Sequence, residues 1–293
     1  EVARREVIEA NEFLADQAFR VLAVAVAPYP VTLGRLDAAQ LPGRLVLLGL
    51  VGMLDPPRDE ARSAVQACKR AGIRVTMITG DNPKTAAAIA AALGICEAGE
   101  KAAVGREIGA MDDEQLLAVC RTQNVFARIE PLHKLRIVQA FKRDGHVAAM
   151  TGDGVNDAPA LEAAGIGIAM GVTGTDVAKE AADMVLADDN FASIVAAVEE
   201  GRVVFNRLRN ATFFLLLTCT GELATLFLSV ALYGESPLEP IQILWVNLVT
   251  GALVAIPLGL EPGTGDELSQ PPRDARVGLL YPGMLMRIGL AGL

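Results

Sequence analysis

The sequence has 293 residues, enough for two or more folding units, and its net charge of −9 argues against nucleic acid as the main partner. The mean hydropathy of +0.37 is high for a soluble protein, and most of the apolar excess lies in the C-terminal third. The four cysteines lack the close spacing of a zinc site or a disulfide framework; they are Cys68, Cys96, Cys120 and Cys219. We therefore expect a chain of which one part is in contact with a lipid bilayer.

The N-terminal part of the chain predicts one helix and two strands. Residues 2–18 follow an amphipathic helical pattern, and residues 19–26 and 45–53 are apolar runs typical of buried strands. The Asp55-Pro56-Pro57-Arg58 segment then interrupts the pattern, because proline fixes φ and removes a hydrogen-bond donor. We expect a domain boundary near residue 55. The first residues include neither Met nor a signal-peptide core, so we expect the chain to begin inside a domain.

Between residues 56 and 200, predicted helices and strands alternate. The helices cover residues 59–71, 83–93, 112–121, 131–143 and 156–164, and the strands cover residues 74–78, 125–129, 146–150, 166–169 and 184–187. Asn82 is a suitable N-cap for the second helix, whose first position is Pro83. This order predicts an α/β domain with a parallel sheet covered by helices on both faces. In such sheets, ligands bind beyond the carboxyl ends of the strands.

Two polar turns follow predicted strands of this sheet. In the first turn, glycines permit a tight bend, and the oxygens of Asp153, Asn156 and Asp157 suit Mg2+. The second turn is Thr79-Gly80-Asp81, and Lys134 begins the helix that follows the 125–129 strand. A single Gly-Asp turn is usually an ordinary turn, and a single lysine usually lies on a solvated face. Together they predict phosphoryl transfer, in which catalysis depends on positioning and charge neutralisation.

Two segments of the C-terminal third predict membrane spans. Residues 211–234 contain one charged residue and residues 240–260 contain none, and each segment is long enough for a spanning helix of roughly 20 residues. The flanks are rich in arginine and the connection is acidic, which predicts that both flanks are cytoplasmic. These residues are Arg202, Arg207, Arg209, Arg273 and Arg276 in the flanks and Glu235 and Glu239 in the connection. Residues 281–293 are typical of the start of a third span.

Glu222 is the charged residue of the first predicted span. A carboxylate at such a position is costly unless it meets a cation, a proton or water, so it is a functional candidate. The alternative is a protonated side chain in a packed interface. In the second span, Asn247 and Thr250 share one helical face. They would serve either as cation ligands or as interhelical hydrogen-bonding groups.

Four segments resemble signature segments of the P-type ATPases and occur in that family's order. They are Asp55-Pro56-Pro57-Arg58, Thr79-Gly80-Asp81-Asn82, Phe126-Ala127-Arg128 with His133-Lys134, and residues 151–161. The resemblance covers nearly the whole chain and implies a haloacid-dehalogenase-like phosphorylation domain at residues 56–200, preceded at residues 1–55 by the end of a nucleotide-binding domain. It implies a cytoplasmic stalk and two transmembrane helices at residues 201–260. Residues 261–293 would form a cytoplasmic loop and the start of a third membrane helix.

The resemblance also implies a role for individual residues. Asp153 would bind the catalytic Mg2+ with support from Asn156 and Asp157; Thr79, Gly80 and Lys134 would contact the phosphoryl group; and Arg20, Asp81 and Arg128 would contact ATP. The family's nucleophile is an aspartate in an Asp-Lys-Thr-Gly-Thr motif, which does not occur in this sequence. We therefore expect an upstream remainder of the same polypeptide to carry it, and this chain alone to be inactive.

The predicted spans resemble the fifth and sixth membrane helices of type II cation pumps, the calcium and sodium/potassium group. The matching segments are Cys219-Thr220-Gly221-Glu222 and residues 244–250, which implies that Glu222, Asn247 and Thr250 contact the transported cation. Calcium pumps have an Asp where this chain has Gly251 and an Asn where it has Cys219. Fewer hard oxygens predict fewer ions per cycle, or a cation other than Ca2+.

These observations predict a multi-pass cation pump of the plasma (inner) membrane, with a cytoplasmic phosphorylation domain that uses ATP and Mg2+. Residues 191–209 would continue into the first span and act as a lever on Glu222. One alternative is a membrane-anchored pseudo-enzyme or regulatory fragment that binds Mg2+ and nucleotide without turnover. Another is a phosphatase domain of the soluble type with an anchor, although polar Asn247 and Thr250 facing Glu222 would argue against a simple anchor.

Overall fold

The structure is a computed structural model that describes residues 2–17, 19–27, 45–53, 58–274 and 277–292. The chain divides into two compact units. One unit consists of Glu1–Gln66 and Val75–Phe191, and the other consists of Ala67–Arg74 and Ala192–Leu293. The predicted domain boundary at the Asp55-Pro56-Pro57 segment lies outside the described residues.

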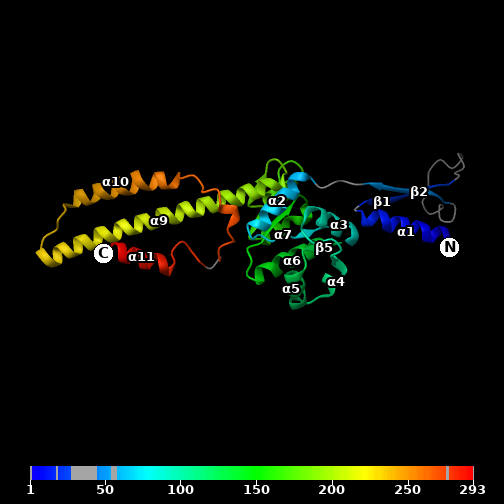
Figure 1. Cartoon of the computed structure of the whole chain (residues 1–293), viewed down its shortest axis with the longest axis horizontal. Helices are drawn as coiled ribbons and strands as arrows, with labels where there is room; N and C mark the ends of the chain where they lie inside the picture. Colours follow the sequence, from blue (N-terminus) through cyan, green and yellow to red (C-terminus); the bar gives the residue numbers. More distant parts are fainter. Residues whose placement is uncertain (1, 18, 28–44, 54–57, 275–276, 293) are drawn as a thin grey trace. The chain divides into compact units, whose positions relative to one another are not determined.

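The N-terminal elements are α1 (Val2–Asp16), β1 (Arg20–Val26) and β2 (Val46–Met53). The two strands pair antiparallel, with Arg20 opposite Met53, and α1 lies alongside them (Figure 1). The predicted helix and strands are therefore confirmed, but the prediction that the strands are buried is wrong. Leu22 and Val51 are each about half exposed, because one helix cannot cover both faces of a two-stranded sheet.

Alternating helices and strands form the rest of the first unit. The elements are α2 (Asp59–Arg70), β3 (Met77–Ile78), α3 (Pro83–Leu93), β4 (Ala103–Val104), α4 (Gly105–Ala110), α5 (Asp113–Thr122), β5 (Val125–Ala127), α6 (Pro131–Arg143), β6 (Ala149–Gly152), α7 (Ala158–Ala163), β7 (Ile166–Met170), α8 (Asp176–Glu180) and β8 (Met184–Leu186). The strands form two three-stranded sheets, in the orders β3-β5-β4 and β6-β7-β8, and the strand pairs within both sheets are parallel. The predicted parallel α/β fold is confirmed.

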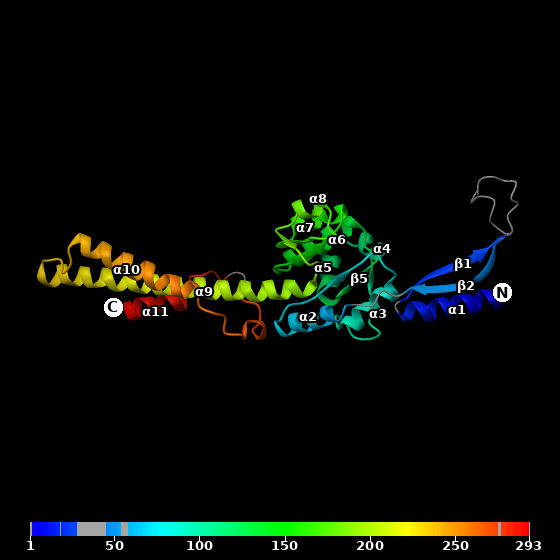
Figure 2. The ribbon, with the colours of Figure 1, turned by 90° about the horizontal axis from the view of Figure 1, so that it is seen from above.

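The core follows from the alternation of side chains along β5. Val125 and Ala127 pack with residues of α2 and α3, whereas Phe126 packs on the opposite face with residues of α4, α5 and α6. Figure 2 shows these two groups of helices on either side of β5. Since successive side chains of a strand point to opposite faces, a three-residue strand buries both groups. All three residues are less than 4% exposed.

Several element boundaries differ from the sequence prediction. The bounds of α3 and α6 are as predicted, and Asn82 caps α3 by accepting a hydrogen bond from the Lys84 backbone N. Strand β6 begins at Ala149 rather than at residue 146, because the His146 N–H still donates to the Phe141 carbonyl at the end of α6. The strand at residues 74–78 shortens to β3. The short elements β4, α4 and α8 were not predicted.

The second unit contains α9 (Phe191–Tyr233), α10 (Pro240–Gly259) and α11 (Pro282–Gly292), of which α9 extends across the division between the units. Figure 2 shows α9 as one unbroken helix, as expected for a stalk that continues into the first span. Among the described residues, α9 and α10 are long and apolar enough to cross a membrane. Helix α10 runs back alongside α9 (Figures 1 and 2).

Arginine side chains of α9 hold the segment that follows α10. Arg202 donates to the carbonyls of Glu267 and Gln270, and Arg207 donates to the carbonyl of Glu261. The buried carboxylate of Glu267 accepts the backbone N–H groups of Thr264 and Gly265. A hydrogen bond from its own backbone N–H, followed by those from Thr264 and Gly265, holds the pKa of Glu267 below its ordinary value. Charged side chains therefore help to hold the segment after α10 on α9.

Candidate phosphoryl-transfer site and membrane carboxylate

The turn after β6 is built around the buried side chain of Asp157, which is 5% exposed. One carboxylate oxygen, Oδ2, accepts the backbone N–H groups of Asp153 and Gly154, both at 3.3 Å. A Cβ atom at Gly152 would lie 2.6 Å from the Asp157 Cβ, so only glycine fits at the end of the strand. The segment of residues 151–161 therefore folds around one carboxylate that its own backbone holds.

The other oxygen of Asp157 binds Lys134. The Lys134 Nζ donates to the Asp157 Oδ1 at 2.6 Å, and the two side chains are 22% and 7% exposed. The first turns of α6 carry Lys134, so this ion pair joins α6 to the turn after β6. Because both oxygens of Asp157 have protein donors, its role in the described structure is to orient Lys134 and the turn.

Asp153 and Asn156 are the exposed polar residues of this motif. The Asp153 carbonyl accepts the N–H of Thr175 at 2.8 Å, but its carboxylate accepts no hydrogen bond from the described residues. Within those residues, no group of three or more His, Cys, Asp and Glu side chains is suited to hold a metal ion. Mg2+ in phosphoryl-transfer sites usually binds one or two carboxylates together with phosphate oxygens and water. An exposed Asp153 carboxylate fits that pattern.

The turn after β3 is closed by its own side chains. The Thr79 hydroxyl donates to the Asp81 Oδ2 at 2.9 Å, and the Asp81 N–H donates back to the Thr79 Oγ1 at 3.1 Å. Gly80 between them is exposed, and a Cβ atom added there would have no other atom within 4 Å. The turn therefore presents its backbone and the Thr79 oxygen at the end of the strand.

A series of contacts links the two predicted turns. The N–H of Arg128 donates to the Asp81 carbonyl and the N–H of Ile129 donates to the Thr79 carbonyl, and the same segment leads into α6 and Lys134. Lys134 then binds Asp157. The structure thus brings both turns and Lys134 to one edge of the α/β core, beyond the carboxyl ends of β3, β5 and β6.

Arg128 has a backbone conformation that sequence reasoning did not anticipate. Its φ of +53° lies in the left-handed region, which is uncommon for a residue other than glycine. A Cβ atom at Gly105 would lie 2.0 Å from the Arg128 carbonyl oxygen, so the strained segment depends on a glycine at the start of α4. Arg128 itself is exposed. Of the other predicted nucleotide contacts, Arg20 begins β1, and its side chain lies outside the described part of the structure.

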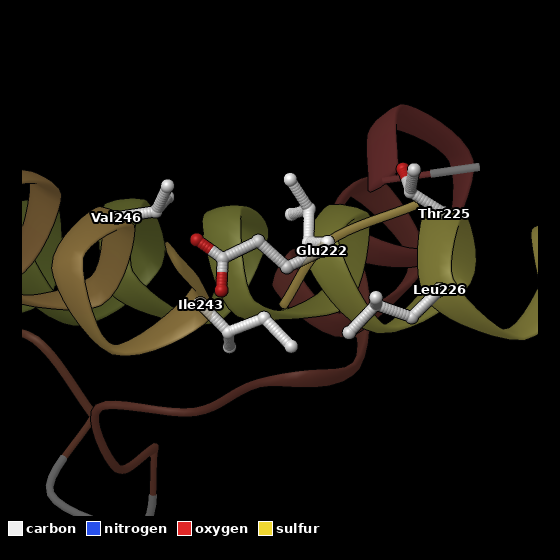
Figure 3. A pocket seen from close by; sticks show the side chains of 6 residues that line it. Glu222, Thr225, Leu226, Ile243 and Val246 are labelled. Atoms are coloured by element: carbon white, nitrogen blue, oxygen red, sulfur yellow. The ribbon is translucent and has the colours of Figure 1, made fainter. Parts of the chain in front are cut away.

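The carboxylate of Glu222 lies in a cavity of about 160 Å³ between α9 and α10. The lining residues are Glu222, Thr225, Leu226, Leu238, Ile243 and Val246. In Figure 3 the Glu222 side chain extends from α9 toward Ile243 and Val246. Asn247 is exposed and does not line this cavity, and the side chain of Thr250 is not among those described. The structure therefore brings apolar residues of α10, rather than Asn247, to Glu222.

Sequence reasoning also missed Asp189, whose carboxylate accepts backbone N–H groups from three successive residues after β7. Its side chain is only half-buried, and in the sequence it is the second of two aspartates before a predicted helix. This position reads as an exposed helix-capping turn. The sequence signal that could have indicated this role for Asp189 is the Gly-Val-Thr-Gly segment at residues 171–174, which follows β7, the strand that pairs with β6.

The fold is that of an α/β domain of the haloacid-dehalogenase type, followed by helices suited to a membrane. Residues 31–165 and 135–198 match two family models described as haloacid dehalogenase-like hydrolase. Residues 1–60 match the model for the P-type ATPase cytoplasmic domain N, and residues 235–293 match that for the cation transporting ATPase C-terminus. The chain belongs to the P-type ATPase family, as the sequence motifs predicted.

Curated relatives agree with this assignment. The chain is 46% identical to calcium-transporting ATPase 1 of Bacillus cereus, over 95% of the chain and 31% of that protein. It is 45% identical to cation-transporting ATPase pma1 of Synechocystis, over 100% of the chain and 32% of the relative. It is 47% identical to the probable cation-transporting ATPase F of Mycobacterium tuberculosis, over 97% and 32%. The chain thus spans about a third of the length of these relatives.

Proposed function

We propose that this chain is part of a membrane pump that uses ATP and Mg2+ to transport a cation through an aspartyl-phosphate. The observation that carries the proposal is the 2.6 Å ion pair between Lys134 and Asp157, which joins α6 to the Asp153 turn. The ion pair positions the Lys134 ammonium, and the turn that it holds carries the exposed carboxylate of Asp153. The names of the relatives, calcium-transporting and cation-transporting ATPases, support the same class of activity.

The residues at the sheet edge have complementary roles in this proposal. Lys134 neutralises charge on the transferred phosphoryl group, while Thr79 and Gly80 orient its oxygens. Asp157 holds Lys134 and the turn in place, and Asn156 supports the site. Asp153 would hold Mg2+, which when bound neutralises phosphate charge. Arg20, Asp81 and Arg128 are the proposed contacts to ATP.

The nucleophile must come from another segment, and the sheets offer a place for it. Strands β3 and β6 are each a terminal strand of their three-stranded sheet, and both carry turns of the candidate site. A terminal strand presents unpaired backbone groups that can accept a further strand. We place the nucleophilic aspartate on a strand from the remainder of the polypeptide that pairs at these edges. Its carboxyl end would then meet Thr79, Lys134 and Asp153.

Glu222 is the proposed contact to the transported cation. A carboxylate within an apolar helix is costly and is typical of an ion pathway. Asn247 and Thr250 on α10 remain proposed ligands through the family resemblance. We infer that the pump lies in the plasma (inner) membrane with the α/β domain in the cytoplasm, because Arg202 and Arg207 precede the first apolar segment.

Phosphorylation of the full-length gene product tests this function. The wild-type protein should form an acid-stable phosphoenzyme from ATP in a cation-dependent manner, and the cation that activates it identifies the transported ion. Asp153→Ala should abolish phosphorylation. Glu222→Gln should still be phosphorylated but should require a different cation concentration. Unchanged cation activation in Glu222→Gln would contradict the transport role of this residue.

The second candidate function is a pseudo-enzyme or regulatory protein that binds Mg2+ and nucleotide without turnover. The cavity beside Glu222 offers specific support, because the residues that line it from α10, Ile243 and Val246, provide no cation ligand in the described structure. The sequence encoded upstream distinguishes the two functions. Absence of an Asp-Lys-Thr-Gly segment there would exclude the aspartyl-phosphate and leave the pseudo-enzyme. A phosphatase domain with a simple anchor would instead hydrolyse phosphate esters with Mg2+ but independently of any transported cation.

A further inference from the structure

The loop after β7 is gathered around the carboxylate of Asp189. The Oδ1 atom accepts the backbone N–H groups of Gly171 at 2.7 Å and Val172 at 3.0 Å. The Oδ2 atom accepts the N–H and the hydroxyl of Thr173, both at 2.8 Å. Four donors on one carboxylate are more than a solvated turn requires. The Asp189 backbone has a φ of +49°, a strained conformation that directs the side chain into this loop.

The same loop also contacts the candidate Mg2+ turn. Two residues beyond Thr173, the N–H of Thr175 donates to the Asp153 carbonyl at 2.8 Å, and its hydroxyl caps α8. The residue between them, Gly174, cannot be replaced without movement, because its Cβ would lie 2.0 Å from the Met170 carbonyl oxygen. The path from Asp189 to Asp153 therefore runs through a short, closely packed segment.

Asp189 lies immediately before the long helix. Phe191, two residues later, is the first residue of α9, and α9 continues without a break to Tyr233. Two contacts with the start of α2 hold the backbone around Asp189. Arg58, which precedes α2, donates to the Asp189 carbonyl at 3.4 Å, and the Asn190 side chain donates to Glu60 of α2 at 3.5 Å. Residues 189 and 190, which lead into α9, are thereby joined both to α2 and to the loop that contacts the Asp153 turn.

We propose that Asp189 is a positioning residue that links the Asp153 turn to the residues that lead into α9. The proposal depends on the proposed function in one respect, which is that the ligand bound by Asp153 is Mg2+. Movement of the Asp153 turn on ligand binding would pull on residues 171–175 and, through the carboxylate, on the start of α9. The backbone donors, Val172 foremost, lower the pKa of Asp189 to about 2, so the side chain is ionised at any physiological pH.

Two substitutions isolate the carboxylate from the backbone strain. Asp189→Asn keeps the size of the side chain and tolerates positive φ, but its amide nitrogen opposes the donors of Thr173. Asp189→Gly keeps positive φ and removes all four acceptor contacts. Asp188→Asn is the matched control, since it removes the same charge one residue earlier on an exposed side chain.

Amide hydrogen exchange of the full-length protein tests the proposal without catalysis. Both Asp189 variants should exchange the amides of Gly171, Val172 and Thr173 at least tenfold faster, and should also accelerate the amides of Asp153 and Gly154. Amides of the α6 core should keep wild-type protection, which shows that the variants fold. The proposal is overturned if only residues 171–173 respond. It is also overturned if Asp188→Asn accelerates Asp153 and Gly154 equally.

The Mg2+ dependence of phosphorylation provides a second readout that a purely structural role would not change. Residues that orient a metal ligand typically alter metal affinity by about 10-fold to 100-fold. Asp189→Asn should therefore raise the half-saturating Mg2+ concentration by about tenfold, whereas Asp188→Asn should not change it. An unchanged Mg2+ dependence would overturn the proposal. If the wild-type protein forms no phosphoenzyme, the proposed function fails, and the exchange of Asp153 and Gly154 still decides the role of Asp189.

Discussion

Removal of the Lys134 ammonium is expected to destabilise the α/β domain as well as to abolish phosphorylation. Lys134→Met keeps an unbranched side chain but leaves the Asp157 carboxylate, 7% exposed, without its cation. Breaking a fully buried ion pair typically costs about 3–5 kcal/mol. Here the lysine is 22% exposed and the Asp157 Oδ2 keeps two backbone donors. We therefore expect Lys134→Met to lower the free energy of unfolding by about 2–3 kcal/mol.

A double-mutant cycle separates this coupling from the cost of each substitution. Asp157→Asn preserves the shape of the side chain, but it leaves the partly solvated Lys134 ammonium without its anion. We therefore expect this variant to lower the free energy of unfolding by about 1–2 kcal/mol. If the ion pair is the shared cause, the double variant should lose less stability than the two single variants added together. We expect a coupling free energy of about 1–2 kcal/mol.

The buried thiol of Cys120 reports the opening of the domain, because it is 1% exposed and packs in the same cluster as Ile137 of α6. With Cys96 and Cys219 replaced by serine and Cys68 followed separately by mass spectrometry, the labelling rate of Cys120 measures the opening equilibrium. If the free energy of unfolding falls by about 2–3 kcal/mol, the labelling rate of Cys120 should rise about 30-fold to 150-fold. Labelling within about twofold of wild type, or additive effects in the double variant, would refute the argument.

Three further predictions concern single positions. Gly152→Ala should destabilise the domain by about 1–3 kcal/mol and impair phosphorylation, because the added Cβ would lie 2.6 Å from the Asp157 Cβ. Gly154→Ala is the control in the same labelling assay and should have a smaller effect, because its Cβ would have no atom nearer than 3.7 Å. Because folding lowers the pKa of Asp189 to about 2, its ionised form stabilises the loop above about pH 4, and protection of the Gly171 amide in wild type should be lost as the pH falls toward 2. In Asp189→Asn this protection should already be reduced at neutral pH and should show no such pH dependence. Glu222→Gln should raise the half-activating cation concentration about tenfold or more, as measured by phosphoenzyme formation; a smaller change would assign the carboxylate a packing role.

The sequence was sufficient where a pattern is local and long. Helix α6 begins at a proline and ends at a basic last turn, and its bounds were predicted without error. Helix α9 was predicted because a charged amphipathic stretch runs into an apolar one without a helix-breaking residue. In each case, information within one segment determined the outcome.

Features that depend on distant contacts were not predictable. Strand β4 has two residues, and its pairing with Phe126 and Ala127 of β5 defines it as a strand. The loop around Asp189 depends on a carboxylate 16 to 18 residues from its donors. The buried position of Asp157 was equally hidden, because an acidic residue in a Gly-rich turn ordinarily indicates a ligand rather than the partner of a lysine.

The membrane helices show how sequence periodicity and packing answer different questions. The spacing of Asn247 and Thr250 predicts that they share a face of a helix, but it does not determine how that helix is rotated about its axis. Rotation is determined by the side chains that meet α9, and these are Ile243 and Val246 beside Glu222. Glu222 lies 31 positions after Phe191, about 45 Å along one helix at about 1.5 Å per residue. In the proposed pump, α9 is the segment that connects this carboxylate to the α/β domain along the chain, so we expect coupling to involve movement of α9 as a body. Such movement can also change the rotation of α10 against α9, and only a change of that kind would bring Asn247 to Glu222.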